Sequence, residues 1–254
     1  MVRNILGGDG TNSSSFAVML HESSRSGIPV INEHVENCVI SHVDASNAEL
    51  VGCRLENVRF YSCVANDLVM RNCDLLNVSL AESALPGLEV HSSHLEGVKV
   101  VKSMLNGMLL EQSSLNSVHL DGVELSGSAL RFDVLYSLSL LNCDLGSMLA
   151  ERCNLYGLRF EGPTQSNTVN ALLKRCKVEG ASLSQVSLSS MKLLDGVVRN
   201  ACLFNSSLQN LDLSGTDLIN VKLVNTCLNN VLASGVDLSQ QGQQSRNVEP
   251  LSMI

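Results

Sequence analysis

Residues 70–90, with the sequence MRNCDLLNVSLAESALPGLEV, place an apolar side chain at every fifth position. The same frame runs without a polar residue from Val30 to Phe160, and a second frame runs from Leu173 to Leu238. A period of five fits neither the 3.6-residue repeat of an α-helix nor the two-residue repeat of a flat strand. It requires a chain that turns a corner after each short straight side, so that one face returns to the interior every five residues.

The positions on either side of each central residue support this geometry. The residue two before the centre is mostly apolar or small, and it shares the inward face of an extended segment. The residue two after the centre is often Gly or Asn, as at Gly52, Asn57 and Asn77. These residues tolerate the positive φ of a tight corner. Small and large inward companions alternate, so we expect a slightly rectangular cross-section with large residues lining two opposite sides.

Several segments resemble the pentapeptide repeat, in which a small residue and Asp or Asn precede a Leu. They include residues 73–77 (CDLLN), 143–145 (CDL) and 216–218 (TDL), and the resemblance extends over about 30–238. In that family four repeats form one square turn. The resemblance implies an all-β fold, a right-handed quadrilateral parallel β-helix of about ten turns. The sequence departs from the family pattern because Asp or Asn is uncommon directly before the central residue of each repeat. A leucine-rich repeat fits residues 208–218 locally, but the five-residue frame leaves no room for its 20–29-residue period.

The sequence divides into three parts. Residues 1–29 form an N-terminal segment, in which residues 16–20 (FAVML) are expected to cap the first turn. Residues 30–238 form the β-helix, and residues 239–254 form a polar tail. From Phe160 to Leu173 the chain advances 13 residues, three more than the frame requires. We therefore expect a loop insertion over 161–170.

The charge distribution argues against nucleic acid as a ligand. The chain carries a formal net charge of −8. Residues 30–160 hold 8 basic against 16 acidic residues, whereas residues 169–238 hold 6 against 5. An acidic surface repels a polyanion, permits a basic partner and aids solubility. No apolar run is long enough for a membrane span, and the N-terminus lacks the apolar core of a secretory signal. These features predict a cytoplasmic protein, or one delivered into a host cell without a cleaved signal peptide.

Candidate catalytic and metal-binding groups are few. Seven of the nine cysteines occupy inward positions, where a thiol acts as a small buried hydrophobe. Cys53 and Cys73 are stacked on adjacent turns, close enough in principle for a disulfide, but without a secretory signal we expect thiols. No Cys or His spacing indicates a metal site, and no cofactor is expected. His119, Asp121 and Ser139 share one outer side without a cleft or an oxyanion donor, so we expect no enzyme activity.

One part of the surface is predicted to bind a partner. Outward tyrosines recur 20 residues apart on neighbouring turns, and aromatic side chains are enriched at interfaces. Asp133 occupies an inward position beside the corner residue Phe132, where a carboxylate is costly, so we expect an irregular turn. The predicted protein-binding residues are Arg131, Phe132, Val134, Tyr136, Asn154 and Tyr156.

These features predict a non-enzymatic protein-binding scaffold, with the partner undetermined. The family resemblance implies two uses: a bacterial effector acting on a host protein, or an acidic DNA mimic that binds a type II topoisomerase. A purely structural repeat module is a third alternative, and an end-to-end homodimer is compatible with a rod. The serine-rich N-terminus favours the effector. The excess of acidic residues over 30–160 favours the mimic. Against the mimic, basic residues such as Arg71 interrupt this acidic region, and the C-terminal residues lack the aromatic dimer module of the topoisomerase-binding members. The acidic residues expected on one side are Glu49, Glu89, Glu111 and Glu151.

Overall fold

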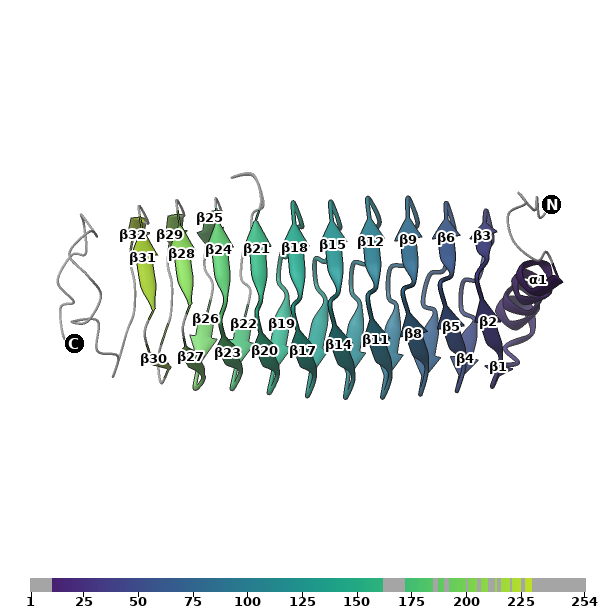
Figure 1. The fold of residues 1–254 in the computed structure, drawn as a ribbon, viewed down its shortest axis with the longest axis horizontal. Coiled ribbons are helices and arrows are strands. Elements are labelled where there is room, and N and C mark those ends of the chain that lie inside the picture. The colour runs from purple at the N-terminus through teal and green to yellow at the C-terminus, as the bar shows by residue number, and fades with distance from the viewer. Residues whose placement is uncertain are drawn as a thin grey trace.

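The computed structural model is a rod with one helix at its N-terminal end and short parallel strands along the rest (Figure 1). It describes residues 11–161 and, beyond them, 172–184, 187–189, 192–199, 201–204, 207–209, 213, 216–219, 221–224 and 227–229. The predicted insertion, apart from Glu161, and the predicted polar tail lie outside the described residues. The expected fold class, an all-β parallel solenoid with little helix, is confirmed.

Three long parallel sheets line the rod, and we name them A, B and C in the order in which the chain enters them. Sheet A consists of β1 (Val30–Ile31), β4 (Glu49–Val51), β7 (Val69–Arg71), β10 (Glu89–His91), β13 (Leu109–Glu111), β16 (Ala129–Arg131), β19 (Leu149–Glu151), β22 (Leu172–Lys174) and β26 (Lys192–Leu194). Sheet B consists of β2 (His34–Glu36), β5 (Arg54–Glu56), β8 (Asp74–Leu76), β11 (His94–Glu96), β14 (Ser114–Asn116), β17 (Val134–Tyr136), β20 (Asn154–Tyr156), β23 (Lys177–Glu179), β27 (Val197–Arg199) and β30 (Asp217–Ile219).

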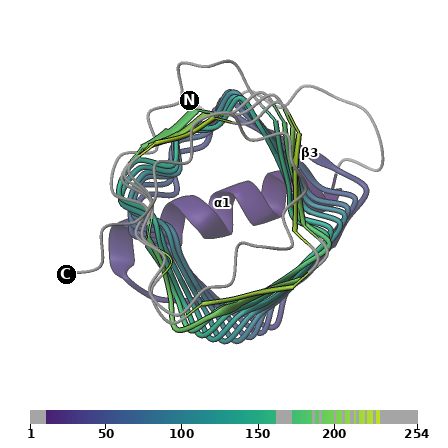
Figure 2. The same ribbon diagram turned by 90° about the vertical axis from the view of Figure 1, so that its left-hand side faces the viewer.

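Sheet C consists of β3 (Val39–Ser41), β6 (Arg59–Tyr61), β9 (Ser79–Ala81), β12 (Lys99–Val101), β15 (His119–Asp121), β18 (Ser139–Leu141), β21 (Arg159–Glu161), β24 (Ser182–Ser184), β28 (Cys202–Phe204) and β31 (Lys222–Val224). The fourth side carries isolated parallel bridges between successive turns, the first joining Asp44 to Val64 and the last joining Glu124 to Asp144. Later in the chain β25 (Ser187–Ser189), β29 (Ser207–Gln209) and β32 (Cys227–Asn229) form a three-stranded sheet. Viewed from the C-terminal end, the stacked turns give a four-sided outline (Figure 2).

The strand register follows the five-residue frame. Each central residue pairs with the one 20 positions away, as Val90 pairs with Leu110. Across the insertion the step is 23, because Ala150 pairs with Leu173, so the three extra residues leave the stack of strands unbroken. The expectation of about ten turns, interrupted by a loop near 161–170, needs correction in the number of turns. Seven turns, β1 to β21, form the uninterrupted block from Val30 to Glu161, and the insertion separates them from the shorter series of strands that follows.

The corners adopt the backbone conformation that the sequence predicts. Gly52, Asn57 and Asn77 have φ values of 65°, 53° and 53°. Gly97 shows why a side chain is excluded at some corners: a Cβ there would lie 2.5 Å from Asn77 Oδ1 of the preceding turn. Positive φ at each corner from Asn32 to Gly157 lets each side of the square begin at the same angle.

The interior is a column of apolar side chains with an internal hydrogen-bond ladder. Central residues such as Leu50, Leu55 and Leu110 are almost fully buried. At small inward positions a serine hydroxyl accepts a hydrogen bond from the backbone N–H one turn earlier, as Ser93 Oγ does from Cys73 N (3.0 Å). The serine then donates to a carbonyl of its own strand, since Ser93 Oγ lies 2.8 Å from His91 O. The hydroxyls thus satisfy backbone donors that would otherwise be buried without partners.

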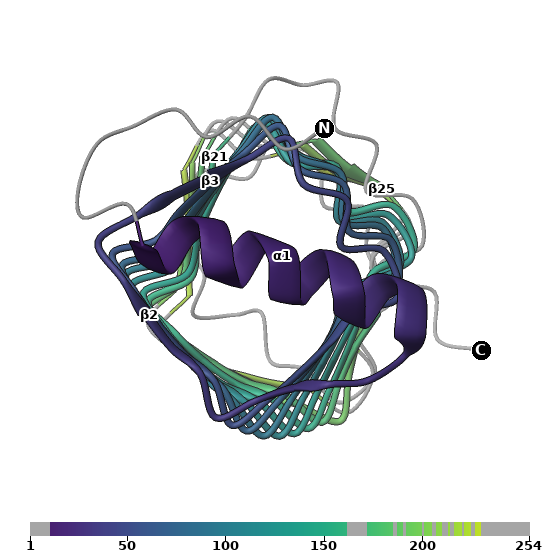
Figure 3. The same ribbon diagram turned by 90° about the vertical axis from the view of Figure 1, so that its right-hand side faces the viewer.

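Helix α1 (Thr11–Ser26) lies across the first turn of the solenoid (Figure 3). Phe16 and Leu20 are 1% and 3% exposed and face the first strands, which α1 contacts. Ser24 Oγ donates to Ser46 O (2.6 Å), and Ser23 Oγ accepts from Glu49 N (3.1 Å). The helix ends at Ser26, and the following Gly27, with a positive φ of 69°, donates its N–H to Ser23 O. We propose that α1 is the cap expected within residues 1–29. No helix in the described part of the chain is long and apolar enough to cross a membrane.

Candidate protein-interaction site

The corner between sheets A and B brings together all six residues predicted to bind a partner. Arg131 ends β16, Phe132 forms the corner, and Val134 and Tyr136 belong to β17. Asn154 and Tyr156 belong to β20, one turn further along, in register with Val134 and Tyr136. We call this surface the aromatic edge, defined as residues 131–136, 151–156 and 174–179. Its residues lie on consecutive turns because the register repeats every 20 or 23 positions.

The two tyrosines of the aromatic edge form one flat unit, in which Tyr156 is half-buried. Their ring centroids lie 5.0 Å apart with an interplanar angle of 9°. Tyr136 is 50% exposed. Lys177 follows on the next turn, with Nζ 5.0 Å from the centroid of the Tyr156 ring and 3.3 Å from its hydroxyl oxygen. Stacking on one side and the ammonium on the other hold the Tyr156 ring in place, so the unit is preorganised for contact.

Phe132 is exposed at a corner where an aromatic residue is unfavourable. Its φ is 57°, and its side chain is 45% exposed. For residues other than Gly, Asn and Asp, the left-handed region costs about 1–2 kcal/mol. Arg152 stands at the same corner of the next turn, with Cζ 5.3 Å from the centroid of the Phe132 ring. The ring and the guanidinium therefore shield one another while both stay at the surface.

Asp133 lies beneath this edge, and the irregular turn expected there is absent. Strand β17 keeps the normal register, although Asp133 is only 1% exposed. Its Oδ1 accepts a hydrogen bond from Ser113 N (2.7 Å), and its Oδ2 accepts one from Arg131 N (2.9 Å). The carboxylate thus takes the place of the serine hydroxyl in the internal ladder, which is why the turn is undistorted. Burial raises the pKa of Asp133 to about 6, and these two hydrogen bonds and nearby Glu111 modify that shift.

Asp133 is expected to make the protein less stable as the pH rises. A folded-state pKa above the unfolded value means that folding takes up a proton, so this contribution is favourable at low pH and is lost as the pH rises toward 6. Compared with Asp133→Ser, the wild type should lose roughly 2–3 kcal/mol of unfolding free energy between pH 4 and pH 7. Urea unfolding of both proteins, followed by circular dichroism, measures this difference. A difference that stays constant with pH would contradict the assignment.

A polar groove adjoins the aromatic edge on its N-terminal side. Its volume is about 410 Å³, and its walls include Asp74, His94 and Ser114 from sheet B and Gln112 and Phe132 from the corner. The groove exists because short serines, Ser92 and Ser114, lie between longer side chains on the turns before and after. The frame places these residues in columns, whereas the groove depends on the difference in side-chain length along each column.

The groove also contains a column of Asp74, His94 and Ser114 on successive turns. His94 Nδ1 lies 2.7 Å from Ser114 Oγ. The backbone N–H of Ser114 donates to Ser93 O, so it is committed to the solenoid and is not free as an oxyanion donor. The group expected on sheet C is not assembled as a triad. His119 and Ser139 are in register, but Asp121 Oδ1 accepts from Asn142 Nδ2 (3.2 Å). Neither column has the arrangement that nucleophilic catalysis requires.

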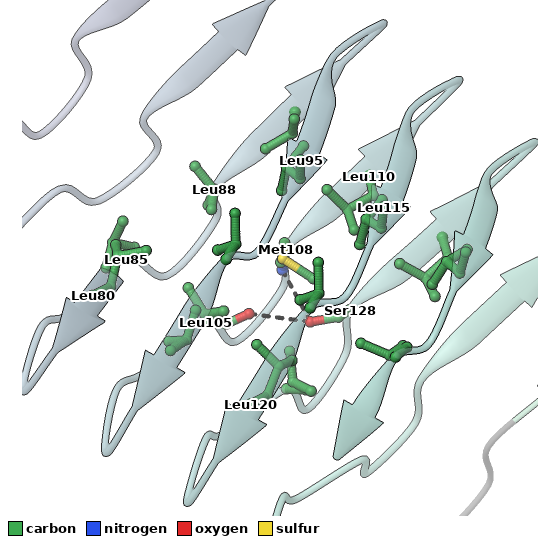
Figure 4. A pocket seen from close by; sticks show the side chains of 18 of the residues that line it. Leu80, Leu85, Leu88, Leu95, Leu105, Met108, Leu110, Leu115, Leu120 and Ser128 are labelled. Atoms are coloured by element: carbon green, nitrogen blue, oxygen red, sulfur yellow. Dashed lines mark hydrogen bonds between the residues drawn. The ribbon is translucent and has the colours of Figure 1, made fainter. Parts of the chain in front are cut away.

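The interior of the described turns is mostly apolar and holds buried thiols. A cavity of about 80 Å³ runs within the core between Met70 and Met148 (Figure 4). Its lining is apolar apart from Ser128, whose Oγ accepts from Met108 N and donates to Leu105 O. The seven inward cysteines of the described residues are buried thiols. Burial raises the pKa of Cys143 to about 11. Within the described ranges, no group of His, Cys, Asp and Glu is suited to hold a metal ion.

The four acidic residues expected on one side do lie on sheet A, but basic residues separate them. Arg71 Nε lies 3.1 Å from Glu49 Oε1. His91 lies between Glu89 and Glu111, with Nε2 and Nδ1 at 3.1 and 3.2 Å from their carboxylates. Arg131 is paired in register with both Glu111 and Glu151. Sheet A therefore interleaves its acidic residues with arginine and histidine and is not a uniformly acidic surface.

Comparison with known proteins identifies the repeat. The family description "Pentapeptide repeats" matches residues 200–240 with eight copies. HetL, a pentapeptide repeat protein involved in heterocyst differentiation regulation in the cyanobacterium Nostoc sp. strain PCC 7120, is 18% identical, with a TM-score of 0.46. The similarity covers 88% of this chain and 97% of HetL. No curated protein matches the sequence.

A second similar structure is QnrB1, a plasmid-mediated fluoroquinolone resistance protein, at 18% identity and a TM-score of 0.36. That similarity covers 76% of this chain and 91% of QnrB1. The matched residues 200–240 share the five-residue period that pairs the strands from β1 onward, although the insertion before Leu173 shifts the frame by three residues. Residues 200–240 of the chain therefore match the pentapeptide-repeat family.

Proposed function

We propose that this protein is a non-enzymatic scaffold that binds a partner protein through the aromatic edge. The observation that carries the proposal is the parallel stack of an exposed Tyr136 on a half-buried Tyr156. Rigid aromatic side chains contribute large contact areas at a low entropic cost, which is why they dominate binding energies at interfaces. Phe132 extends the same surface around the corner of the solenoid.

The fold separates binding from stability. Inward residues such as Leu135 and Leu155 are buried and stack along the core, whereas the tyrosines one position later point outward. A solenoid is stabilised by stacking between neighbouring turns, so its outer faces are free to vary. The aromatic edge therefore serves recognition at little cost to the fold.

The acidic DNA mimic is the weaker alternative. Such a mimic needs a continuous negative surface. On sheet A, Arg71, His91 and Arg131 lie among the glutamates and interrupt that surface. Delivery as a bacterial effector and a purely structural role stay predictions, because no contact in the described residues favours either. The cytoplasmic or host-delivered location and the end-to-end homodimer also stay predictions.

Replacing both tyrosines by alanine should abolish capture of the partner while leaving thermal unfolding almost unchanged. The measurement is quantitative mass spectrometry of proteins that immobilised wild type and Tyr136→Ala/Tyr156→Ala retain from bacterial and host lysates. Tyr61→Ala is the matched control, because Tyr61 is 39% exposed on sheet C. The partner should be retained by the wild type and the control but at least tenfold less by the double variant. Equal retention by all three proteins would contradict the proposal.

A further inference from the structure

We infer that the aromatic edge recognises an acidic, extended segment of its partner that carries an aromatic or aliphatic residue. This inference rests on the proposed function and adds the chemistry of the partner. It follows from the charges around the tyrosines, from the way their side chains are held, and from the groove beside them.

The aromatic edge is a basic patch on an acidic protein. Its outward charged residues are two acidic ones, Glu151 and Glu179, and five basic ones, namely Arg131, Arg152, Lys174, Arg175 and Lys177. These outward residues carry +3, and with the buried Asp133 the edge carries +2, which, set against the −8 of the whole chain, leaves −10 elsewhere. Opposite charges on facing surfaces steer association and select partners, so this local reversal of sign favours an acidic ligand.

Several of these cations are not neutralised within the described structure. Lys177 lies 3.3 Å from Glu179 Oε2. By contrast, no described carboxylate lies within 4.0 Å of the side-chain nitrogens of Arg131, Arg152, Lys174 or Arg175. Arg131 Nε is buried and has no acceptor among the described residues. A buried donor without a partner is costly, so a carboxylate that reaches Arg131 would relieve that cost.

Arg152 is preorganised to receive a carboxylate. The Phe132 ring supports one face of its guanidinium, at 5.3 Å from Cζ to the ring centroid. Arg152 is exposed, and Arg175 follows it at the same corner one turn later. When an aromatic ring packs against the plane of a guanidinium, the N–H groups at the guanidinium's edge stay available. Two of these N–H groups can donate to the two oxygens of one carboxylate.

The dimensions fit an extended peptide. The corner column from Asn72 through Phe132 to Arg175 contains six consecutive turns, so it spans about 24 Å at roughly 4.8 Å per turn. An extended chain advances about 3.3 Å per residue, so about seven residues cover this length. The groove between Asn72 and Phe132 would hold the uncharged part of the partner segment. The aromatic edge would bind the carboxylates and the apolar residue of that segment.

A protein segment fits this surface better than a nucleic acid. Both are anionic, and both stack on tyrosine. The basic patch is limited to three turns, however, and Glu111 and Asp74 lie on the turns before it. A long polyanion would extend past the patch onto the rest of the chain, which carries a net charge of −10, and repulsion would oppose it there.

The test is selection of peptides from a random 12-residue display library on the immobilised full-length chain. Binding of the most enriched peptides, labelled with fluorescein, is then measured by fluorescence anisotropy. Arg152→Glu/Arg175→Glu is the main variant, and Arg152→Gln/Arg175→Gln removes the charges without reversing them. The matched control is Arg59→Glu/Lys99→Glu, which makes the same change in net charge at exposed positions on sheet C. Circular dichroism establishes that each variant is folded.

Selected peptides should be rich in Asp and Glu with at least one apolar residue. Arg152→Glu/Arg175→Glu should lower the affinity for these peptides at least tenfold, and Arg152→Gln/Arg175→Gln should lower it severalfold. The control variant should lower it by less than twofold. Neutral peptides that lose binding with Tyr136→Ala/Tyr156→Ala, but not with the arginine variants, would overturn this inference and keep the proposed function. Peptides whose binding is unchanged by the tyrosine variant and by the arginine variants would overturn both this inference and the proposed function. A selection that enriches no peptide would do the same. Tighter, arginine-dependent binding of a 12-nucleotide oligothymidine would show that the edge is a nucleic-acid site instead.

Discussion

Leu110→Asp is expected to unfold the solenoid or to break it at that turn. Leu110 is 3% exposed and pairs in register with Val90 and Leu130, so the carboxylate would lie between stacked apolar side chains. The adjoining cavity of about 80 Å³ has a single polar lining residue, Ser128, and its hydroxyl is already engaged. Removing the leucine and burying an unpaired charge together should cost more than about 4 kcal/mol. Circular dichroism and urea unfolding measure the loss.

Leu109→Asp is the matched control for that change. Leu109 is the preceding residue of β13, points outward and is half-buried, with Glu89 and Ala129 beside it. The new carboxylate would stay hydrated, so we expect a loss below about 1 kcal/mol. Equal damage from the two substitutions would mean that the inward and outward positions of the frame are exchanged.

Phe16→Asp is expected to release α1 and make the protein self-associate. Phe16 is 1% exposed and lies with Ala17 and Leu20 on the face of α1 that covers the first turn. Without this helix, Val30, Val35 and Ile40 would form an exposed apolar end surrounded by strands. An uncovered solenoid end recruits other copies, which is why such ends are normally capped.

The measurement is size-exclusion chromatography with light scattering over a range of protein concentrations. Val18→Asp is the control, because Val18 is 48% exposed on the outer face of the same helix. This control should match the oligomeric state of the wild type, whereas Phe16→Asp should form larger species. If both variants behave like the wild type, α1 does not protect the end of the rod.

The architecture was predictable because it depends on a period. Five-residue spacing determines which residues face inward, where the corners fall, and which Cα atoms are neighbours in adjacent turns. That is why the stacking of Tyr136 on Tyr156 and the positive φ at Asn57 were expected from the sequence. The three extra residues before Leu173 were countable for the same reason, and the register across the insertion agrees with that count.

The tertiary structure decided whatever depends on side-chain rotamers or on segments without the repeat. The helical form of residues 11–26 has no counterpart in the five-residue pattern, and its apolar face is determined by the end of the solenoid that it covers. Asp133 was expected to distort its turn, but two backbone N–H groups reach its carboxylate, a match that only the folded backbone creates. Arg152 contacts Phe132 and His91 bridges two glutamates because long side chains cross between turns. Periodicity specifies neighbouring backbones, whereas the chemistry of a surface depends on where side chains end, and that requires the folded structure.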